Sequence, residues 1–436
     1  MLTQRHVLRF WLPLFVSWLF MTAEGPMVSA IINRLPNEVI MLAAQGLVVS
    51  LSVTIESPII NMLATSTAMV KDRQSFRQVR RFTLHWMVGL TLVSVLLAFT
   101  PLFDWVVVRG LRVPIEVAEW VRPGLRVLCL WSAAIAWRRF LQGVLIHFRR
   151  PQAVARGTLW RLGAGALTAI TLAWVTDLPG VLVGSITLQV AVIVEALYAT
   201  WAVQPLLKGV LSAESPSLAA APLTYRDLFW FHLPLASTSL LTLLVQPMVA
   251  FSLARLDNPT QSLAAWPLLF QLLLLVRASA MALPEVIIAL DRDSQAATSL
   301  RQFILKLTGV NVLLILLLAF TPLSLLYLKT IQDATSAISA DVRGGLMILA
   351  LFPALATINF GLRGFLISRR VTPPVNTGMF INLAVTAAVL AAGMWLHAPA
   401  IATAAVSLNL SLLVETFYLG WQAQHRLVWQ WQPATP

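Results

Sequence analysis

Charged side chains are scarce in this sequence of 436 residues: Asp, Glu, Lys and Arg make up 11% of it, whereas hydrophobic residues make up 58%. A soluble globular domain has roughly a quarter of its residues charged, because its surface faces water. Apolar runs of about 20 residues recur along the whole chain, and that length crosses the ~30 Å hydrocarbon layer of a membrane. The composition therefore excludes an ordinary soluble protein and predicts an all-α, multi-pass membrane protein.

Cysteine, phosphate-binding loops and metal-ligand clusters are also missing. The single cysteine, Cys129, excludes an internal disulfide framework and argues against a cysteine-based metal site. No glycine-rich loop ends in Lys-Ser or Lys-Thr, and no His-Glu-x-x-His motif is present. The run Asp291-Arg292-Asp293 has the Asp-x-Asp form of metal-binding glycosyltransferases, but it aligns with a short charged turn, "KDR", in the first half of the chain. We therefore expect no cofactor, no metal and no enzymatic activity.

The sequence contains an internal repeat. The heptapeptide "LLAFTPL" begins at Leu96 and again at Leu317, so the offset is 317 − 96 = 221 residues. At the same offset "FWLPL" (10–14) falls on "FHLPL" (231–235), and "GPMVSAIINRL" (25–35) falls on "QPMVAFSLARL" (246–256). Because one register holds across half the chain, we interpret the protein as a tandem duplication.

Each half divides into six apolar spans. In the first half we place them near 8–32, 39–68, 82–107, 119–147, 154–176 and 180–204, and in the second near 226–254, 261–290, 299–328, 343–368, 374–396 and 399–424. An even number of spans makes the halves parallel repeats. The prediction is twelve transmembrane helices in two six-helix bundles: 1–204, a cytoplasmic linker at 205–224 that is rich in Pro, Ser and Ala, and 225–436.

Basic residues are unevenly divided between the two sides of these spans. The side with both termini collects 18 Lys and Arg, and the other side has seven. Positive residues stay in the cytoplasm, so we expect both termini there and the protein in the plasma (inner) membrane. Topology and contact with anionic membrane lipids explain the net charge of +13, and we expect no nucleic-acid partner because no soluble domain carries these charges.

Charged residues inside the spans are the candidate site. A charge at mid-bilayer costs roughly 3 kcal/mol, so such residues usually face an interior or a wet cavity. Glu56 and Arg277 lie near the middle of spans 2 and 8 and occupy equivalent repeat positions. We expect them to meet in a cavity between the bundles, either as substrate and coupling residues or as a structural ion pair.

Glu24 lies beside Gly25 and Pro26 in span 1. Proline removes a backbone hydrogen bond and glycine loosens the turn, so Gly25 and Pro26 are the candidate hinge. Glu24 is either a protonatable carboxylate at this hinge, as ion-coupled transport requires, or a packing residue of a kinked helix.

Two further glutamates, Glu195 and Glu415, are repeat-equivalent on spans 6 and 12. We expect a structural pairing role for them, with Arg138 and Arg139 as partners, and a functional role as the alternative.

Twelve spans in two parallel repeats, with an acidic residue and a proline in a bent first helix, resemble the MATE-like transporters of the multidrug/oligosaccharidyl-lipid/polysaccharide (MOP) exporter superfamily. The stretch "RLPNEVIMLAAQGLVVSLSVTIESPI" (34–59) and the segments "FLQGVLI" and "GLRGFLI" look most like the progressive ankylosis (ANK) branch. The resemblance implies efflux of a small organic solute by antiport with H⁺ or Na⁺. MATE proteins imply an organic cation, and ANK proteins imply an anion such as pyrophosphate, citrate or a nucleotide.

Three alternatives remain beside this interpretation. The major facilitator fold also has six plus six spans, but the loop "KDRQSFRQVRR" (71–81) lacks the glycines of its usual motif. A flippase for a lipid-linked substrate belongs to the same superfamily as MATE, and it would show a hydrophobic lateral opening. An intramembrane transferase is the third alternative.

Overall fold

The computed structural model describes residues 3–209, 223–291, 294–369 and 371–428. Within these residues every regular element is a helix, and eleven helical spans are long and apolar enough to cross a membrane. The remaining span, 115–147, carries Arg138 and Arg139 and is the repeat equivalent of the apolar span Ser336–Ser368. The chain is a multi-pass, all-α membrane protein with twelve transmembrane helices, which confirms the predicted fold class.

The helices form two compact units. Unit 1 comprises Met1–Ala30 and Met248–Pro436, and unit 2 comprises Ile31–Pro247. The elements assigned to unit 1 are α1 (Gln4–Ile32), α10 (Val245–Leu253), α11 (Pro259–Met281), α12 (Leu283–Leu290), α13 (Ser294–Phe320), α14 (Leu323–Leu326), η3 (Tyr327–Ile331), α15 (Ser336–Ile348), η4 (Leu349–Leu351), α16 (Phe352–Ser368), α17 (Pro373–Trp395) and α18 (Ala400–Val428). The elements of unit 2 are α2 (Glu38–Ile60), α3 (Met62–Met69), α4 (Arg73–Phe99), η1 (Asp104–Gly110), α5 (Ile115–Val127), η2 (Leu128–Leu130), α6 (Trp131–His147), α7 (Pro151–Val175), α8 (Gly180–Lys208) and α9 (Tyr225–Leu243).

The first span of each repeat packs with helices of the other repeat. In unit 1, Trp11 of α1 lies in the hydrophobic core with residues of α12, α13 and α16, and its Nε1 donates to the Ser279 carbonyl at 2.9 Å. In unit 2, His232 of α9 is fully buried, and its Nε2 donates to the Pro58 carbonyl at 2.8 Å. Trp11 and His232 are repeat-equivalent, as are Ser279 and Pro58, so the same contact is formed in both units.

The compact units group α1 and α9 with helices of the other repeat, and the division of the chain into bundles 1–204 and 225–436 stays a prediction. The physical reason is the burial of α1 and α9, each of which places a ring N–H against a carbonyl on the span that it covers. Helix α8 continues through Pro205 to Lys208, so the first residues of the expected linker 205–224 are helical. Residues 210–222, the rest of the expected linker, lie outside the described residues.

Breaks in the helices recur at the repeat offset. Span 2 is interrupted at Asn61, between α2 and α3, and span 8 at the equivalent Ala282, between α11 and α12. The 3₁₀ turns η2 and η4 interrupt spans 4 and 10 at equivalent positions. Asn37 and Asn258 precede α2 and α11 with φ of 58° and 50°, a left-handed conformation that asparagine tolerates. These shared irregularities support the duplication that the sequence predicts.

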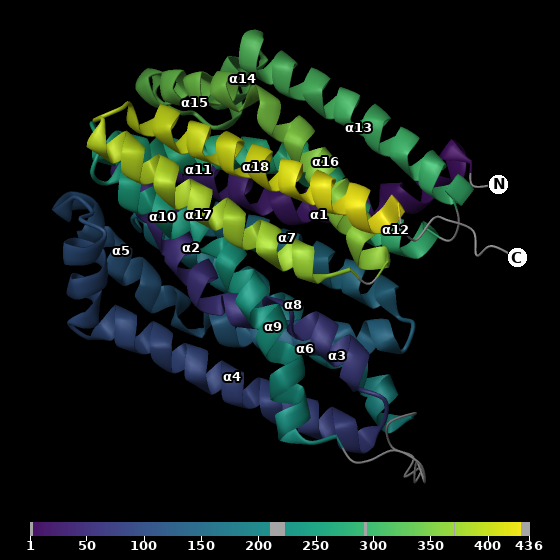
Figure 1. Ribbon diagram of the computed structural model, residues 1–436. Helices are drawn as coiled ribbons and strands as arrows, with labels where there is room; N and C mark the ends of the chain where they lie inside the picture. The colour runs from purple at the N-terminus through teal and green to yellow at the C-terminus, as the bar shows by residue number, and fades with distance from the viewer. Residues whose placement is uncertain (1–2, 210–222, 292–293, 370, 429–436) are drawn as a thin grey trace, which may run out of the picture. The chain divides into compact units, whose positions relative to one another are not determined.

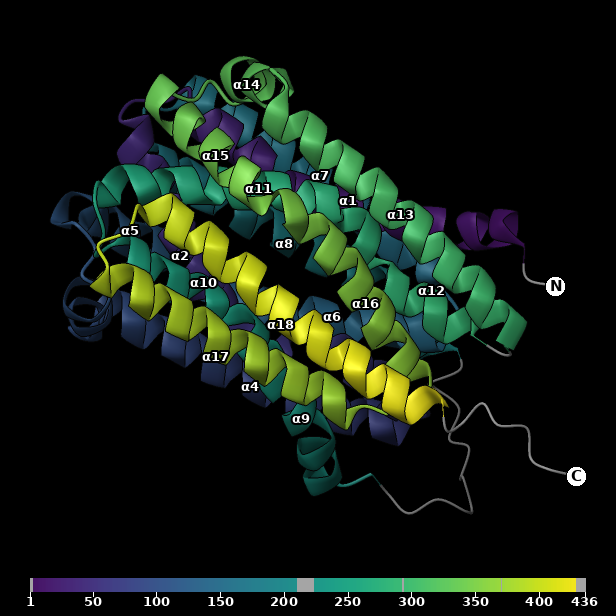
Figure 2. The same ribbon diagram turned by 45° about the horizontal axis from the view of Figure 1, so that its top comes forward.

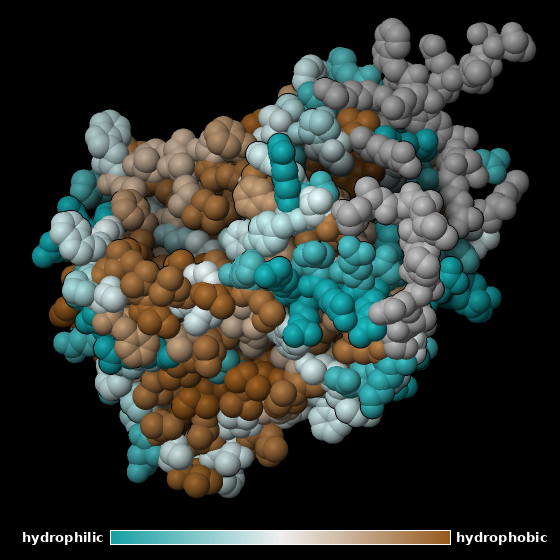
Figure 3. Space-filling model, turned by 90° about the horizontal axis from the view of Figure 1, so that it is seen from below, coloured by the Kyte–Doolittle hydropathy of each residue, from teal (hydrophilic) through white to brown (hydrophobic). Residues whose placement is uncertain are grey.

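Each unit presents apolar side chains outward, as a lipid-facing surface requires. Helices α17 and α18 of unit 1 lie side by side (Figure 1), and α13 lies beside α16 (Figure 2). Brown apolar residues cover much of the face in Figure 3, with teal hydrophilic residues gathered in a separate area. The repeat-equivalent Trp174 and Trp395 are 87% and 80% exposed at the ends of α7 and α17, a position typical of aromatic residues at the membrane–water boundary.

The first turn of α4 is closed by a reciprocal cap. Asp72 accepts a hydrogen bond from the Ser75 N–H at 2.8 Å, and the Ser75 hydroxyl accepts one from the Asp72 N–H at 3.0 Å. The bond from the Ser75 backbone lowers the pKa of Asp72 below its ordinary 3.8. The stabilisation is therefore present above that pH and is lost as the pH falls through the lowered pKa.

We expect Asp72→Ala to reduce the free energy of unfolding by about 1 kcal/mol at neutral pH, because the cap is lost. Thermal unfolding in detergent measures the difference, which should shrink below pH 3.8. Asp72→Asn keeps an acceptor at this position and is the matched control. Equal stability of the alanine variant and wild type at pH 7 would contradict the proposed role of the cap.

Candidate functional site

The candidate hinge lies within an unbroken helix. Helix α1 runs from Gln4 to Ile32 with Pro26 inside it, whereas the equivalent span 7 is interrupted at Leu244, between α9 and α10. Glu24 is only 6% exposed, so its carboxyl group lies inside the protein at the proline segment. The structure therefore places Glu24, Gly25 and Pro26 together on one buried stretch of α1.

Gln271 of α11 holds this stretch from one side. The hydroxyl of Ser29 lies 2.9 Å from Gln271 Nε2 and 3.1 Å from Gln271 Oε1. A Cβ added at Gly25 would lie 3.2 Å from the Gln271 side chain, which is closer than ordinary van der Waals contact. Glycine at this position lets the Gln271 side chain lie close against α1, in addition to its expected effect on helix bending.

Gln332 holds the same stretch through the backbone. Its Nε2 donates to the Pro26 carbonyl at 3.1 Å and to the Tyr327 hydroxyl at 2.7 Å, and the residue is fully buried. Tyr327 lies in η3, between two spans, and burial raises the pKa of its phenol above 10.0. The phenol therefore stays neutral at physiological pH.

Three neutral residues of this site, Ser29, Gln271 and Gln332, were not predicted from the sequence. Ser29 and Gln271 are uncharged residues within apolar spans, and Gln332 lies in a connection between two spans. Glutamine offered no signal, because it also occurs in other spans, as at Gln45, Gln142 and Gln189.

We expect Gln332→Ala to reduce the free energy of unfolding by about 1–3 kcal/mol, because a buried carbonyl loses its side-chain donor. Gln302→Ala, at an exposed position of α13, is the matched control and should be neutral. Thermal unfolding of both variants measures the effect. Identical unfolding midpoints for the two variants would show that the hydrogen bond from Gln332 to the Pro26 carbonyl does not contribute to stability.

Glu195 joins three helices of unit 2. It is 1% exposed on α8 and accepts hydrogen bonds from Arg138 Nη1 at 2.7 Å and Gln142 Nε2 at 2.9 Å, both on α6. Arg161 of α7 lies 3.6 Å from the same carboxylate. Burial of a carboxylate is costly without such partners, and here two cations and an amide supply them.

Glu415 occupies the equivalent place in unit 1, also at 1% exposure on α18. It pairs with Arg363 of α16 and accepts a hydrogen bond from Asn382 Nδ2 of α17 at 3.0 Å. Arg363 stands at the repeat position of Gln142, and Asn382 at that of Arg161. The two repeats therefore share the buried carboxylate and an arginine from the equivalent helices α6 and α16, whereas only the first repeat adds a second arginine, Arg161 of α7. Of the two expected partners, Arg138 forms an ion pair with Glu195. Glu415 forms its ion pair with Arg363, which was not among the expected partners.

Arg277 faces α16 inside unit 1. Its guanidinium carbon lies 5.5 Å from the ring centre of Phe360 and 6.0 Å from that of Phe352. Its charge interacts with those of Arg363 and Glu415. Arg277 therefore belongs to the same electrostatic network as the buried carboxylate of unit 1.

Glu56 lies in unit 2 and is 6% exposed on α2. The charge of Arg139, on α6, interacts with Glu56 and with Glu195. Glu56 and Arg277 thus each have charged neighbours within their own unit. The expected Glu56–Arg277 contact stays a prediction.

The Asp-x-Asp run lies partly outside the described residues, since these omit Arg292 and Asp293. The carboxylate of Asp291 accepts hydrogen bonds from the Ser368 hydroxyl at 2.7 Å and from Arg369 at 3.0 and 3.1 Å. Asp291 therefore closes the end of span 8 onto the end of span 10. Across the described part of the chain, no group of three or more His, Cys, Asp or Glu residues is placed to hold a metal.

Solved structures share this fold at low sequence identity. An inward-facing multidrug resistance MATE family transporter of the MOP superfamily is 14% identical, with 94% of this chain and 95% of that chain covered and a TM-score of 0.68. A MOP superfamily transporter from Pyrococcus furiosus, described by the reverse polarity of its binding pocket, is 12% identical over 98% and 96% of the two chains, with a TM-score of 0.69. The lipid II flippase MurJ in its inward closed conformation is 11% identical over 94% and 87%, with a TM-score of 0.70.

The fold is thus that of MATE-like transporters of the MOP superfamily. No known family profile and no curated protein sequence matches the chain. The resemblance to the ANK branch rests on the sequence alone and stays a prediction.

Proposed function

We propose that this protein is a secondary active transporter that exports a small organic solute by alternating access, with H⁺ or Na⁺ as the coupling ion. The fold shared with MATE transporters supports the mechanism. The observation that carries the proposal is Glu24, a carboxyl group 6% exposed beside Pro26 in an apolar span. A titratable group in such a place is costly, so it is usually retained for a function.

Glu24 is the proposed coupling residue, and the segment Gly25–Pro26 is the proposed hinge. Protonation changes the charge of Glu24, and a helix without the Pro26 N–H is easier to bend at that point. A bound ion can shift the helix between two shapes only if it binds them with different affinity. The contacts of Gln271 and Gln332 define one of these shapes.

The Glu195 and Glu415 networks have a different proposed role. Each ties three helices of one unit through a single buried carboxylate, which keeps these helices together as a rigid group. Rigid groups of helices are what alternating access moves. We therefore assign these residues to the framework and not to substrate binding.

A lipid-linked substrate flippase is the second candidate function. It is supported by the likeness of the fold to the lipid II flippase MurJ, at a TM-score of 0.70. Both functions fit a protein of the plasma (inner) membrane with cytoplasmic termini, which the distribution of basic residues favours.

A ligand-stabilisation screen of the purified protein separates the candidates. The compounds are organic cations, pyrophosphate, citrate, nucleotides and lipid-linked head groups, each tested by its effect on the unfolding midpoint. Stabilisation by a small solute supports the exporter, and stabilisation by a lipid-linked compound alone supports the flippase. A protein that none of these classes stabilises would contradict both.

A further inference from the structure

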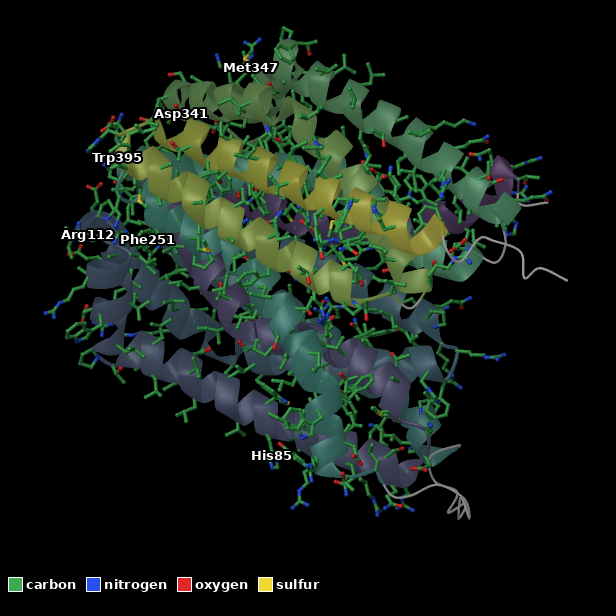
Figure 4. The ribbon with its side chains drawn as sticks, viewed as in Figure 1. His85, Arg112, Phe251, Asp341, Met347 and Trp395 are labelled. Carbon is green, nitrogen blue, oxygen red and sulfur yellow. The ribbon has the colours of Figure 1, made fainter. Side chains whose placement is uncertain are left out.

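A groove opens on the outer surface of unit 2, between α4 and α9. Its volume is about 350 Å³, which falls within the range of small-molecule sites. His85, Trp86, Gly89, Leu90 and Val93 of α4 form one wall, and Tyr225 and Phe229 of α9 form the other. Figure 4 labels His85 on the α4 side of this groove.

Gly89 makes the middle of the groove open. A Cβ placed on Gly89 would have nothing within 4 Å, and the residue is exposed. Exposed apolar residues surround it, with Val88 at 70% and Leu92 at 55% exposure. The groove is therefore a recess in the lipid-facing surface, where hydrocarbon is the surrounding solvent.

Polar and basic groups lie at one end of the groove. His85 Nδ1 lies 3.3 Å from the Tyr225 hydroxyl, which closes the groove between the two helices. Arg81 is exposed one turn before His85 on the same face of α4. The same end of the two helices carries Lys71, Arg73, Arg77, Arg80 and Arg226.

The acidic residues at this end are already engaged. Asp72 is bonded to Ser75, and Asp227 to Thr224, each in a helix cap. The six basic residues outnumber these two aspartates, so the end of the groove carries a net positive charge, and juxtamembrane clusters of Lys and Arg attract anionic lipids.

The dimensions fit one leaflet of a bilayer. Arg81, His85, Gly89 and Val93 are spaced four residues apart, so they share one face of α4. At 1.5 Å per residue this stripe covers about 18 Å. Half of the ~30 Å hydrocarbon layer is of similar depth. A molecule that lies along this stripe would contact the Arg81 guanidinium at the membrane–water interface. It would then contact the His85–Tyr225 pair and the open apolar part of the groove at Gly89.

We propose that this groove binds an anionic phospholipid, with its phosphate at Arg81 and one acyl chain along Gly89 between α4 and α9. The lipid comes from the leaflet that faces the arginine-rich end of α4. It would stabilise the packing of α9 in unit 2, because it contacts both helices. The groove belongs to unit 2 and does not include Glu24, and the proposal does not depend on the proposed transport function.

Native mass spectrometry of the full-length protein tests the proposal with phosphatidylglycerol and phosphatidylcholine as probes. We expect wild type to retain one phosphatidylglycerol in preference to phosphatidylcholine. Gly89→Leu fills the groove and should reduce the bound fraction at least fivefold. Gly309→Leu, at another helical glycine with nothing within 4 Å, is the matched control and should bind as wild type does.

Arg81→Gln gives an independent test at an exposed position, should Gly89→Leu be poorly produced. It should remove the preference for phosphatidylglycerol, whereas Arg80→Gln, one residue away on a different face, should keep it. Equal retention of both lipids by wild type, or unchanged retention by Gly89→Leu or Arg81→Gln, would overturn the proposal.

Discussion

Replacing Glu195 by glutamine should reduce the free energy of unfolding by about 3–5 kcal/mol, since it leaves the cations of Arg138 and Arg161 buried without a carboxylate. The expected result is a large fall in the unfolding midpoint and in the yield of folded protein. Fluorescence-detected size-exclusion chromatography after heating measures both.

An exposed ion pair provides the control. Asp104 and Arg122 lie 3.8 Å apart with side chains 49% and 29% exposed, so water already screens their attraction. Asp104→Asn should therefore change the stability by less than about 1 kcal/mol. Similar effects of Glu195→Gln and Asp104→Asn would contradict the importance of the buried network.

The repeat offers a sharper test of the same network. The triple variant Arg138→Asn, Gln142→Arg and Arg161→Asn introduces the residues that stand at the equivalent positions of the second repeat, namely Asn359, Arg363 and Asn382. Of these, Arg363 and Asn382 contact Glu415. We expect this variant to be more stable than Arg138→Asn with Arg161→Asn alone, because the new arginine restores the compensating charge. No gain from Gln142→Arg would show that the two networks are not interchangeable.

Glu24→Gln should abolish gradient-driven transport, by at least about tenfold, while folding and membrane insertion remain intact. The variant is nearly isosteric but cannot take up or release a proton, so the coupling ion loses its means of shifting the helix. The measurement is solute flux in proteoliposomes under an imposed gradient. Glu119→Gln, at an exposed glutamate of α5, is the control and should transport as wild type does.

Wild-type flux and wild-type pH dependence in Glu24→Gln would remove Glu24 from the mechanism. Loss of flux together with loss of folded protein would instead assign Glu24 to packing, the alternative that the sequence left open.

The sequence predicted the fold class, whereas the irregular elements were found only in the structure, where they recur at the repeat offset. Apolar length indicates spans, and the offset of 221 residues pairs Asn61 with Ala282 at the two helix breaks. The sequence did not predict that α1 and α9 exchange units. Trp11 and His232 occupy equivalent repeat positions. This does not indicate which of the two repeats provides the backbone carbonyl that accepts the hydrogen bond from each ring.

The charged residues of the candidate site were proposed from the sequence. The neutral residues that contact the hinge were not. Buried carboxylates such as Glu24 and Glu195 are conspicuous in apolar spans because their burial is costly. Gln271 and Gln332 attach to the hinge through hydrogen bonds that depend on tertiary packing, which no local pattern encodes. The arginine partner of Glu415 was also missed, because Arg363 replaces a glutamine of the first repeat.

Solute flux into proteoliposomes of purified wild-type protein tests the central claim most directly. The solute is the one that stabilises the protein in the ligand screen, and the H⁺ and Na⁺ gradients are imposed separately. We predict that the solute accumulates against its own gradient when one of the two ion gradients is imposed. This accumulation should be lost when an ionophore dissipates that ion gradient. Flux equal to that of empty liposomes, or accumulation that survives the ionophore, would contradict ion-coupled transport.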